Sequence, residues 1–258
     1  MPGSESVIRF TDVSKVFLRP DGRSDFVAVD KLSFAVAKGE IVAVLGKTGC
    51  GKSTMFNIVA GLLEPTSGTA TVIGHDPFRE FDFFRGKIGI VFQGDRLMPW
   101  RSALANVLLG LQIIDAAPKA AEATARRWLE RLGLAAHETD YPHALSGGMR
   151  QRVSIARAFA VNPDILLCDE PFSALDEMTA RDLRAEFVRL VRQDSKTALF
   201  ITHQINEALE IGDRVMVFQR PARIAYEARL GRDMTPERRR QVQEDIMRVL
   251  SVDPTEAV

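Results

Sequence analysis

A glycine-rich segment ending in lysine and serine carries the clearest chemistry of this sequence. Residues Gly46–Ser53 fit the pattern G-x-x-x-x-G-K-[ST] in full. Its glycines let the backbone fold so that successive N–H groups face a phosphate, and a helix starting there adds its dipole. Lys52 can then reach the β- and γ-phosphates, and the Ser53 hydroxyl can bind Mg²⁺. Although a chance glycine-rich turn is the alternative, we expect a site for a nucleoside triphosphate with magnesium.

Two adjacent carboxylates follow a second apolar run. Ile165–Cys168 is followed by Asp169 and Glu170. Such a pair often marks only an exposed turn. At the carboxyl end of a buried parallel strand, however, it would lie where ligands bind in sheets of this kind. Asp169 would hold the magnesium, directly or through water, and Glu170 would orient the attacking water or accept its proton.

Short apolar, β-branched runs that alternate with helical patterns must position these groups. Such alternation predicts an α/β fold with a mostly parallel sheet covered on both sides. Strands are expected at Val7–Phe17, Phe26–Ala37, Ile41–Leu45, Thr69–Ile73, Ile88–Phe92, Ile165–Cys168, Ala198–Ile201, Arg214–Phe218 and Arg223–Tyr226. Helices are expected at Lys52–Gly61, Lys119–Leu132 and Pro236–Leu250. The stretch 99–161 shows no good strand pattern, so it should form a separate helical lobe.

The bulk composition excludes several classes of protein. The 258 residues carry 34 Lys and Arg against 34 Asp and Glu, whereas a general nucleic-acid binder usually has a basic excess. With 46% hydrophobic residues the chain is not of the disordered class. Its longest uncharged, mostly apolar run lies between Arg101 and Asp115, shorter than the roughly 20 residues that span a bilayer. We therefore expect no nucleic-acid partner and no membrane span.

The residues Leu145–Arg152 identify a family. They read Leu-Ser-Gly-Gly-Met-Arg-Gln-Arg, and LSGG followed by Gln-Arg resembles the signature of the ATP-binding subunits of ABC transporters. On its own, Ser146 also fits the cap of a helix, and a helix N-terminus is itself an anion site. The resemblance implies a P-loop NTPase (RecA-like) fold with an N-terminal antiparallel β subdomain and an inserted helical subdomain at about 97–160. It also implies a second copy of the chain, so that two copies close head-to-tail around two ATP molecules.

The resemblance extends over about residues 7–220 and assigns further roles. Gln93 matches the glutamine that senses magnesium, His203 a histidine at the γ-phosphate, and Phe17 the aromatic residue that stacks on adenine, although Phe17 could simply be packed. Residues 173–176 match a loop that crosses to the other copy. The expected catalytic residues are Glu170, His203 and Gln93, and the expected magnesium ligands are Ser53, Gln93 and Asp169. ATP would be bound by Phe17, Gly46, Lys47, Thr48, Gly49, Cys50, Gly51, Lys52, Ser53, Thr54, Ser146, Gly147 and Gly148.

The segment Val91–Arg101 bears on the type of transporter. Its Leu-Met-Pro-Trp run, with Asn106-Val107 after it, is similar to importers of nitrate, sulfonate, taurine and bicarbonate. Met98, Pro99 and Trp100 are large apolar groups on an irregular segment, and exposed apolar clusters usually mark docking sites. We expect membrane permease subunits to dock near Gln93–Arg101, although a core-packing loop is the alternative.

Together these features predict an ATP-hydrolysing importer subunit for a small anionic or polar solute. It would lie at the cytoplasmic face of the membrane and respond indirectly to a solute-binding protein. The expected ATPase domain covers residues 7–240, with a C-terminal tail at 241–258. Another kind of ABC transporter, or a soluble ABC ATPase, remains the alternative. The two cysteines are expected to be unreactive, unless Lys52 lowers the pKa of Cys50 and makes it redox-sensitive.

Overall fold

The computed structural model describes residues 5–18, 25–231 and 234–252. The chain divides into two compact units. Unit 1 combines Met1–Phe81 with Thr197–Val258, and unit 2 is Asp82–Lys196. Each unit is described by itself below.

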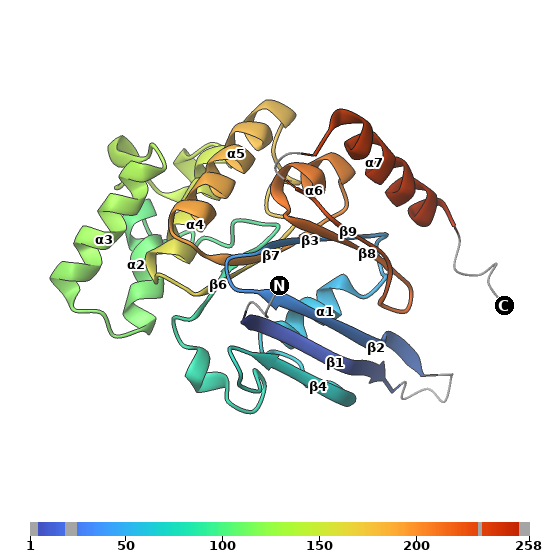
Figure 1. Cartoon of the computed structure of the whole chain (residues 1–258). Coiled ribbons are helices and arrows are strands. Elements are labelled where there is room, and N and C mark those ends of the chain that lie inside the picture. Colours follow the sequence, from blue (N-terminus) through green and yellow to red (C-terminus); the bar gives the residue numbers. More distant parts are fainter. Residues whose placement is uncertain (1–4, 19–24, 232–233, 253–258) are drawn as a thin grey trace. The chain divides into compact units, whose positions relative to one another are not determined.

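Unit 1 contains a three-stranded antiparallel sheet (Figure 1). Its strands are β1 (Ser6–Phe17), β2 (Phe26–Ala37) and β4 (Ser67–Val72), in the order β2-β1-β4. Strands β1 and β2 pair from Ser6 with Ala37 to Phe17 with Phe26. This register pairs the aromatic residues Phe17 and Phe26 at the end where β1 leads along the chain into β2.

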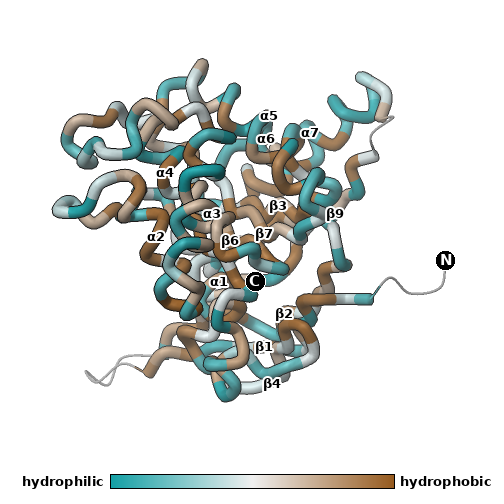
Figure 2. The backbone as a smooth tube through the Cα atoms, turned by 90° about the vertical axis from the view of Figure 1, so that its left-hand side faces the viewer, coloured by the Kyte–Doolittle hydropathy of each residue, from teal (hydrophilic) through white to brown (hydrophobic). Residues whose placement is uncertain are grey.

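The other strands of unit 1 carry the glycine-rich loop. They are β3 (Ile41–Gly46), β7 (Thr197–Thr202), β8 (Arg214–Gln219) and β9 (Arg223–Arg229). Strand β3 lies between β7 and β8 and is parallel to both, while β9 pairs antiparallel with β8. Every residue of β3 and β7 is buried, as expected for parallel strands covered on both faces, and Figure 2 shows both as largely hydrophobic.

Three helices pack on the strands of unit 1. Helix α1 (Lys52–Val59) contacts β2, β3 and β4, α6 (Ile205–Ile211) contacts β3 and β7, and α7 (Pro236–Ser251) contacts β8 and β9. Val242 and Ile246 of α7 are fully buried among apolar residues of β3, β8 and β9. The buried residues of helix α7 therefore lie after residue 240, within the stretch predicted to be a C-terminal tail, whereas its first turn is exposed.

Unit 2 contains two parallel strands and four helices. Strands β5 (Ile88–Val91) and β6 (Ile165–Asp169) pair in parallel. The helices are α2 (Ala103–Ile113), α3 (Pro118–Arg131), α4 (Gly147–Ala160) and α5 (Glu177–Gln193), and Phe81–Phe84, Ala135–His137 and Pro142–Ala144 form short 3₁₀ turns. Phe159 of α4 joins the helices, since its ring lies 5.0 Å from that of Trp128 and 5.9 Å from that of Phe187.

The predicted α/β fold is confirmed. Each expected strand is present within three residues of its predicted bounds, and stretch 99–161 contains helices and no strand. Helix α1 ends at Val59 rather than Gly61, because Gly61 adopts the left-handed conformation typical of a residue just past a helix. Within the described residues, no helix has both the length and the apolar character needed to cross a membrane.

Candidate nucleotide-binding site

The glycine-rich loop of unit 1 joins strand β3 to helix α1, as its motif requires. Gly49 and Gly51 adopt positive φ angles of 78° and 104°, a region that L side chains rarely occupy. A Cβ added at Gly51 would lie 2.3 Å from the carbonyl oxygen of Ala28. A Cβ at Gly49 would meet nothing within 4 Å. Gly51 therefore needs to be glycine for both space and backbone angle, whereas Gly49 needs it for its angle alone.

Lys52 is held inside this loop. Its side chain is buried, and the ammonium Nζ donates to the carbonyl oxygens of Gly46 at 2.6 Å and Lys47 at 3.1 Å. An ammonium has three donors, and the third makes only a long contact of 4.0 Å with the weak acceptor Cys50 Sγ, so a phosphate oxygen can replace that contact. The loop borders a cavity of about 160 Å³ that is lined by Phe26, Gly49, Gly51, Lys52, Ser53 and Thr54. The cavity thus combines a fixed positive charge with the amino end of a helix.

The residues at this cavity fit magnesium-bound triphosphate. Ser53 is exposed in the first turn of α1 and lines the cavity. Its hydroxyl is a hard oxygen donor, the type Mg²⁺ prefers, and Mg²⁺ is usually held by few protein ligands together with substrate phosphates. The open, positively charged cradle beside it suits those phosphates.

Two aromatic residues lie in or next to the lining of this cavity. Phe17 is 38% exposed, so it is not simply packed in the core. Its ring stacks against that of Phe26 with centroids 6.4 Å apart, and Lys15 Nζ lies 5.4 Å from the Phe17 centroid. Phe26, rather than Phe17, lines the cavity. Phe26 was not among the predicted site residues, although its position at the start of the strand paired with β1 was a usable signal.

His203 follows directly from a strand beside the loop. Thr202, the last residue of β7, is paired with Leu45, the last residue before Gly46. His203 is exposed and therefore leaves the same edge of the sheet as the loop. The Thr202 hydroxyl donates to the buried Glu207 and accepts from Gln204 N–H at 3.0 Å. These bonds fix the chain on both sides of His203.

The geometry of Cys50 opposes a redox role. The thiol is buried, and desolvation raises its pKa even though Lys52 Nζ, 4.0 Å from the sulfur, acts in the opposite direction. Lys52 therefore does not lower the pKa of Cys50 below its ordinary value. Cys168 is fully buried, and burial raises the pKa of its thiol as well.

We expect Cys50 to react slowly with a maleimide at pH 7.5. Because the folded protein raises the thiol pKa, the reactive thiolate should appear only above the ordinary cysteine pKa, so the labelling rate should keep rising through pH 9. Mass spectrometry of the labelled protein would measure this rate. Fast labelling that levels off below pH 8 would show a depressed pKa instead.

Unit 2 brings Gln93, Asp169 and Glu170 to one end of a strand pair. Val91 of β5 is paired with Cys168 of β6, so the residues after each leave the same edge. Gln93 is exposed, and both carboxylates are half-buried. Glu170 has a φ of 45°, and its carbonyl oxygen accepts from the N–H and hydroxyl of Ser173 at 3.2 and 3.0 Å. Such left-handed positions cluster at functional sites.

The signature residues begin helix α4. Ser146 is exposed, and its hydroxyl accepts from Met149 N–H at 3.3 Å, which confirms it as the cap of this helix. Gly147 is exposed beside it, and a Cβ at Gly148 would lie 2.8 Å from the Thr179 methyl group. Asp176 caps α5 in turn, and the N–H of Thr179 lowers the pKa of its carboxyl group. Two capped helix starts therefore adjoin one another.

The segment Gln93–Arg101, which we call the docking loop, only partly matches the expected apolar cluster. Trp100 is 71% exposed and Pro99 is exposed, but Met98 is half-buried and Leu97 is buried. The fully buried Asn106 holds the loop, accepting from Met98 N–H at 2.7 Å and donating to the carbonyl oxygens of Met98, Arg101 and Ser102 at 3.0–3.2 Å. Leu97 and Met98 thus have the core-packing role that was the alternative.

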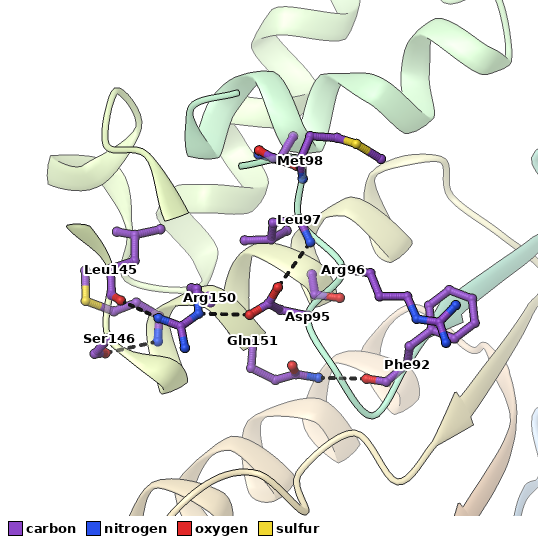
Figure 3. A network of polar contacts seen from close by, with 12 residues as sticks. Phe92, Asp95, Arg96, Leu97, Met98, Leu145, Ser146, Arg150 and Gln151 are labelled. Atoms are coloured by element: carbon purple, nitrogen blue, oxygen red, sulfur yellow. Dashed lines mark hydrogen bonds and ion pairs between the residues drawn. The ribbon is translucent and has the colours of Figure 1, made fainter. Parts of the chain in front are cut away.

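Beside the docking loop, unit 2 has a largely apolar groove of about 400 Å³. Its lining includes Phe92, Arg96, Met98, Leu109 and Ile113. The Arg96 guanidinium lies 4.0 Å from the centroid of the Phe92 ring, which places a cation at the rim (Figure 3). This groove was not predicted from the sequence, because its residues come from separate elements.

The predicted site residues are thus distributed over the two units. Unit 1 holds Phe17, Gly46, Lys47, Thr48, Gly49, Cys50, Gly51, Lys52, Ser53, Thr54 and His203, and unit 2 holds Gln93, Ser146, Gly147, Gly148, Asp169 and Glu170. Within each unit these groups gather at strand ends or helix starts.

Comparison with known proteins identifies the family of this chain. The family model described as ABC transporter matches residues 29–173. The taurine import ATP-binding protein TauB of Pseudomonas aeruginosa is 42% identical over 224 residues, which are 86% of this chain and 82% of that protein. The aliphatic sulfonates import ATP-binding protein SsuB 1 of Burkholderia lata is 38% identical over 84% of this chain and 63% of that protein.

A solved structure is similar over nearly its whole length. The dimeric ATP-binding cassette MJ0796 in a post-hydrolysis state bound to ADP and Pi has a TM-score of 0.75 and 32% identity, covering 87% of this chain and 99% of that one. The family match covers more than half of the chain, and the relatives are well above 30% identical. The chain therefore belongs to the family of ABC transporter ATP-binding proteins, and its activity is ATP hydrolysis coupled to transport.

Proposed function

We propose that this protein is the ATP-hydrolysing subunit of an ABC importer for a small anionic or polar solute of the sulfonate or taurine class. The observation that supports its ATP chemistry best is the burial of Lys52 in the loop between β3 and α1, with its ammonium held on two loop carbonyls. The import assignment is supported by the relatives named for taurine and sulfonate import. Nitrate and bicarbonate remain in the same chemical class of small anions.

In the proposed mechanism each group acts from the position described above. When bound, Mg–ATP would supply the phosphoryl group, and its Mg²⁺ would neutralise part of the negative charge of the phosphates. Lys52 and the N–H groups of the loop bind the phosphates, Ser53 with Asp169 and Gln93 would hold the metal, and Phe17 would stack on adenine. Glu170 orients water and accepts its proton. His203 binds the γ-phosphate from the adjacent strand end. Phosphoryl transfer depends mainly on such positioning and charge stabilisation.

A second copy would complete the site. Ser146 and Gly147 are exposed at the amino end of α4, and such an end favours an anion. In the proposed assembly this end faces the γ-phosphate bound by the other copy, so a single copy is inactive. The dimeric structure of the similar cassette supports this arrangement.

The docking loop and its groove would receive the permease. An apolar cavity of about 400 Å³ with Trp100 exposed nearby has the size and chemistry to accept one short helix of a membrane partner. The protein would then lie at the cytoplasmic face of the membrane, and a solute-binding protein would act on it through the permease.

Replacing Trp100 with Glu tests this proposal. We expect the variant to bind ATP normally but to lose co-purification with the co-expressed permease, because a charge would replace a large apolar contact. Leu62→Glu, which changes a similarly exposed apolar residue of unit 1, is the matched control and should keep the complex. Normal recovery of the complex with Trp100→Glu would refute docking at this loop.

Solute class can be tested in the assembled transporter. Vesicles that contain the complex should hydrolyse ATP faster when binding protein loaded with taurine or an alkanesulfonate is added. Stimulation by a binding protein for an uncharged sugar, with none by the anion-loaded forms, would contradict the proposed class.

A further inference from the structure

A polar network in unit 2 joins the docking loop to the signature helix (Figure 3). Its centre is Asp95, one of whose carboxylate oxygens accepts from Arg150 Nε at 2.9 Å. The other oxygen accepts from the backbone N–H of Leu97 at 3.1 Å. One side chain therefore contacts both the loop backbone and helix α4.

Arg150 extends this network to the start of the signature. Its Nη1 donates to the carbonyl oxygen of Leu145 at 2.8 Å, the residue directly before Ser146. The backbone N–H of Arg150 also donates to the carbonyl oxygen of Ser146 at 2.9 Å, as part of the first turn of the helix. The guanidinium thus connects Asp95 to the peptide that precedes the exposed cap of α4.

Other contacts hold the loop and the residues that flank it against α4 and α2 at several points. Gln151 Nε2 donates to the carbonyl oxygen of Phe92 at 3.4 Å, and Arg157 donates to the carbonyl oxygens of Asp95 and Arg96 at 2.8 Å. Asn106 of α2 holds Met98 and the residues after it, as described above. A displacement of the docking loop must therefore break these bonds or move α4 with it.

The exposure of the ion pair argues that its role is positional. The side chains of Arg150 and Asp95 are 36% and 29% exposed, and pairs of this kind contribute little to stability. Their geometry is specific all the same, because the guanidinium bonds a carboxylate and a carbonyl oxygen at once.

We propose that Asp95 and Arg150 form a positioning pair that couples the docking loop to the first turn of α4, and so sets where Ser146 meets the nucleotide of the second copy. This inference rests on the proposed function for the roles of Ser146 and of the loop. It adds that occupancy of the loop and placement of Ser146 are linked through this ion pair, the part of the network that reaches the carbonyl oxygen of Leu145.

A double-mutant cycle on the full-length protein tests the pair. In Asp95→Asn the amide oxygen can still accept from Leu97 N–H, so mainly the charge toward Arg150 is lost. We expect Asp95→Asn and Arg150→Gln each to lower kcat about tenfold, a size usual for coupled contacts, and to leave the Kd for ATP within twofold. The double variant should be no slower than either single variant. Additive losses, or unchanged kcat, would overturn the proposal.

The pair Arg131–Asp194 provides a matched control. It lies in the same unit with side chains 32% and 27% exposed but has no bond to the docking loop. Asp194→Asn should lower thermal stability about as much as Asp95→Asn and leave kcat unchanged. If Asp194→Asn lowered kcat equally, the effect of Asp95 would be merely structural and the proposal would be wrong.

Tryptophan fluorescence can report directly on the coupling between the docking loop and the nucleotide. The protein has two tryptophans, so Trp128→Phe leaves Trp100 of the docking loop as a single reporter. Adding a non-hydrolysable ATP analogue with Mg²⁺ should change acrylamide quenching of Trp100 in this reference protein. The change should fall at least threefold when Asp95→Asn or Arg150→Gln is added, and persist with Asp194→Asn.

These outcomes separate the two proposals. If light scattering shows that the reference protein stays monomeric with the analogue, the proposed shared site fails. If it dimerises and Trp100 shows no change, or the full change survives in Asp95→Asn, the coupling by this pair is overturned while the shared site stands.

Discussion

Replacing Glu170 with Gln is expected to slow ATP hydrolysis by about 10²–10⁴-fold, the usual contribution of a general base. Glutamine keeps the size of the side chain and can still contact water, but it cannot accept a proton. Glu170 lies at a turn fixed by two hydrogen bonds from Ser173 to its carbonyl oxygen, which the substitution leaves in place. ATP binding and closure of the dimer should therefore remain, and the variant should accumulate as an ATP-bound dimer.

Steady-state release of phosphate measures this effect, and size exclusion with ATP measures the dimer. Glu138→Gln removes a carboxylate of the same unit that forms a surface pair with Arg126, and it should hydrolyse ATP at the parent rate. A Glu170→Gln rate within tenfold of the parent would refute the assignment of the base.

Replacing Lys52 with Met should weaken ATP binding about 100-fold, because charge-assisted hydrogen bonds to phosphate contribute about 1.5–3 kcal/mol each. Methionine has a similar length, so it should fill the buried position without the ammonium. The carbonyl oxygens of Gly46 and Lys47 lose their donor, and the loop should become less ordered as a result. Hydrolysis should fall below detection.

Titration with a fluorescent ATP analogue measures this loss. Lys38→Met changes an exposed lysine in the turn before β3, and it should bind the analogue like the parent. Binding by Lys52→Met within threefold of the parent would show that the ammonium does not contact the phosphates.

The fold could be predicted largely from local patterns. The uninterrupted apolar runs of β3 and β7 indicate strands buried on both faces, and the turn residues around them fix their bounds. The phosphate loop could also be predicted from the sequence, because its function depends on residues close together in the chain. The packing of α7 could not be placed in the same way, since the burial of Val242 depends on strands from distant parts of the chain.

The site was predictable only as far as single motifs reach. Phe26 lines the cavity because β1 and β2 are paired in a particular register, and local sequence patterns do not determine that register. Met98 looked exposed beside Trp100, but Asn106 draws its backbone against α2. The contact between Asp95 and Arg150 spans 55 residues, and no local pattern indicates such a contact.

The dependence of specific ATPase activity on protein concentration tests the central claim most directly. If each site is completed by Ser146 of a second copy, then activity per molecule at saturating Mg–ATP should rise steeply with concentration and level off once the dimer forms. Dilution should reverse the rise. A specific activity that stays constant from nanomolar to micromolar protein, with monomers throughout, would contradict a shared site.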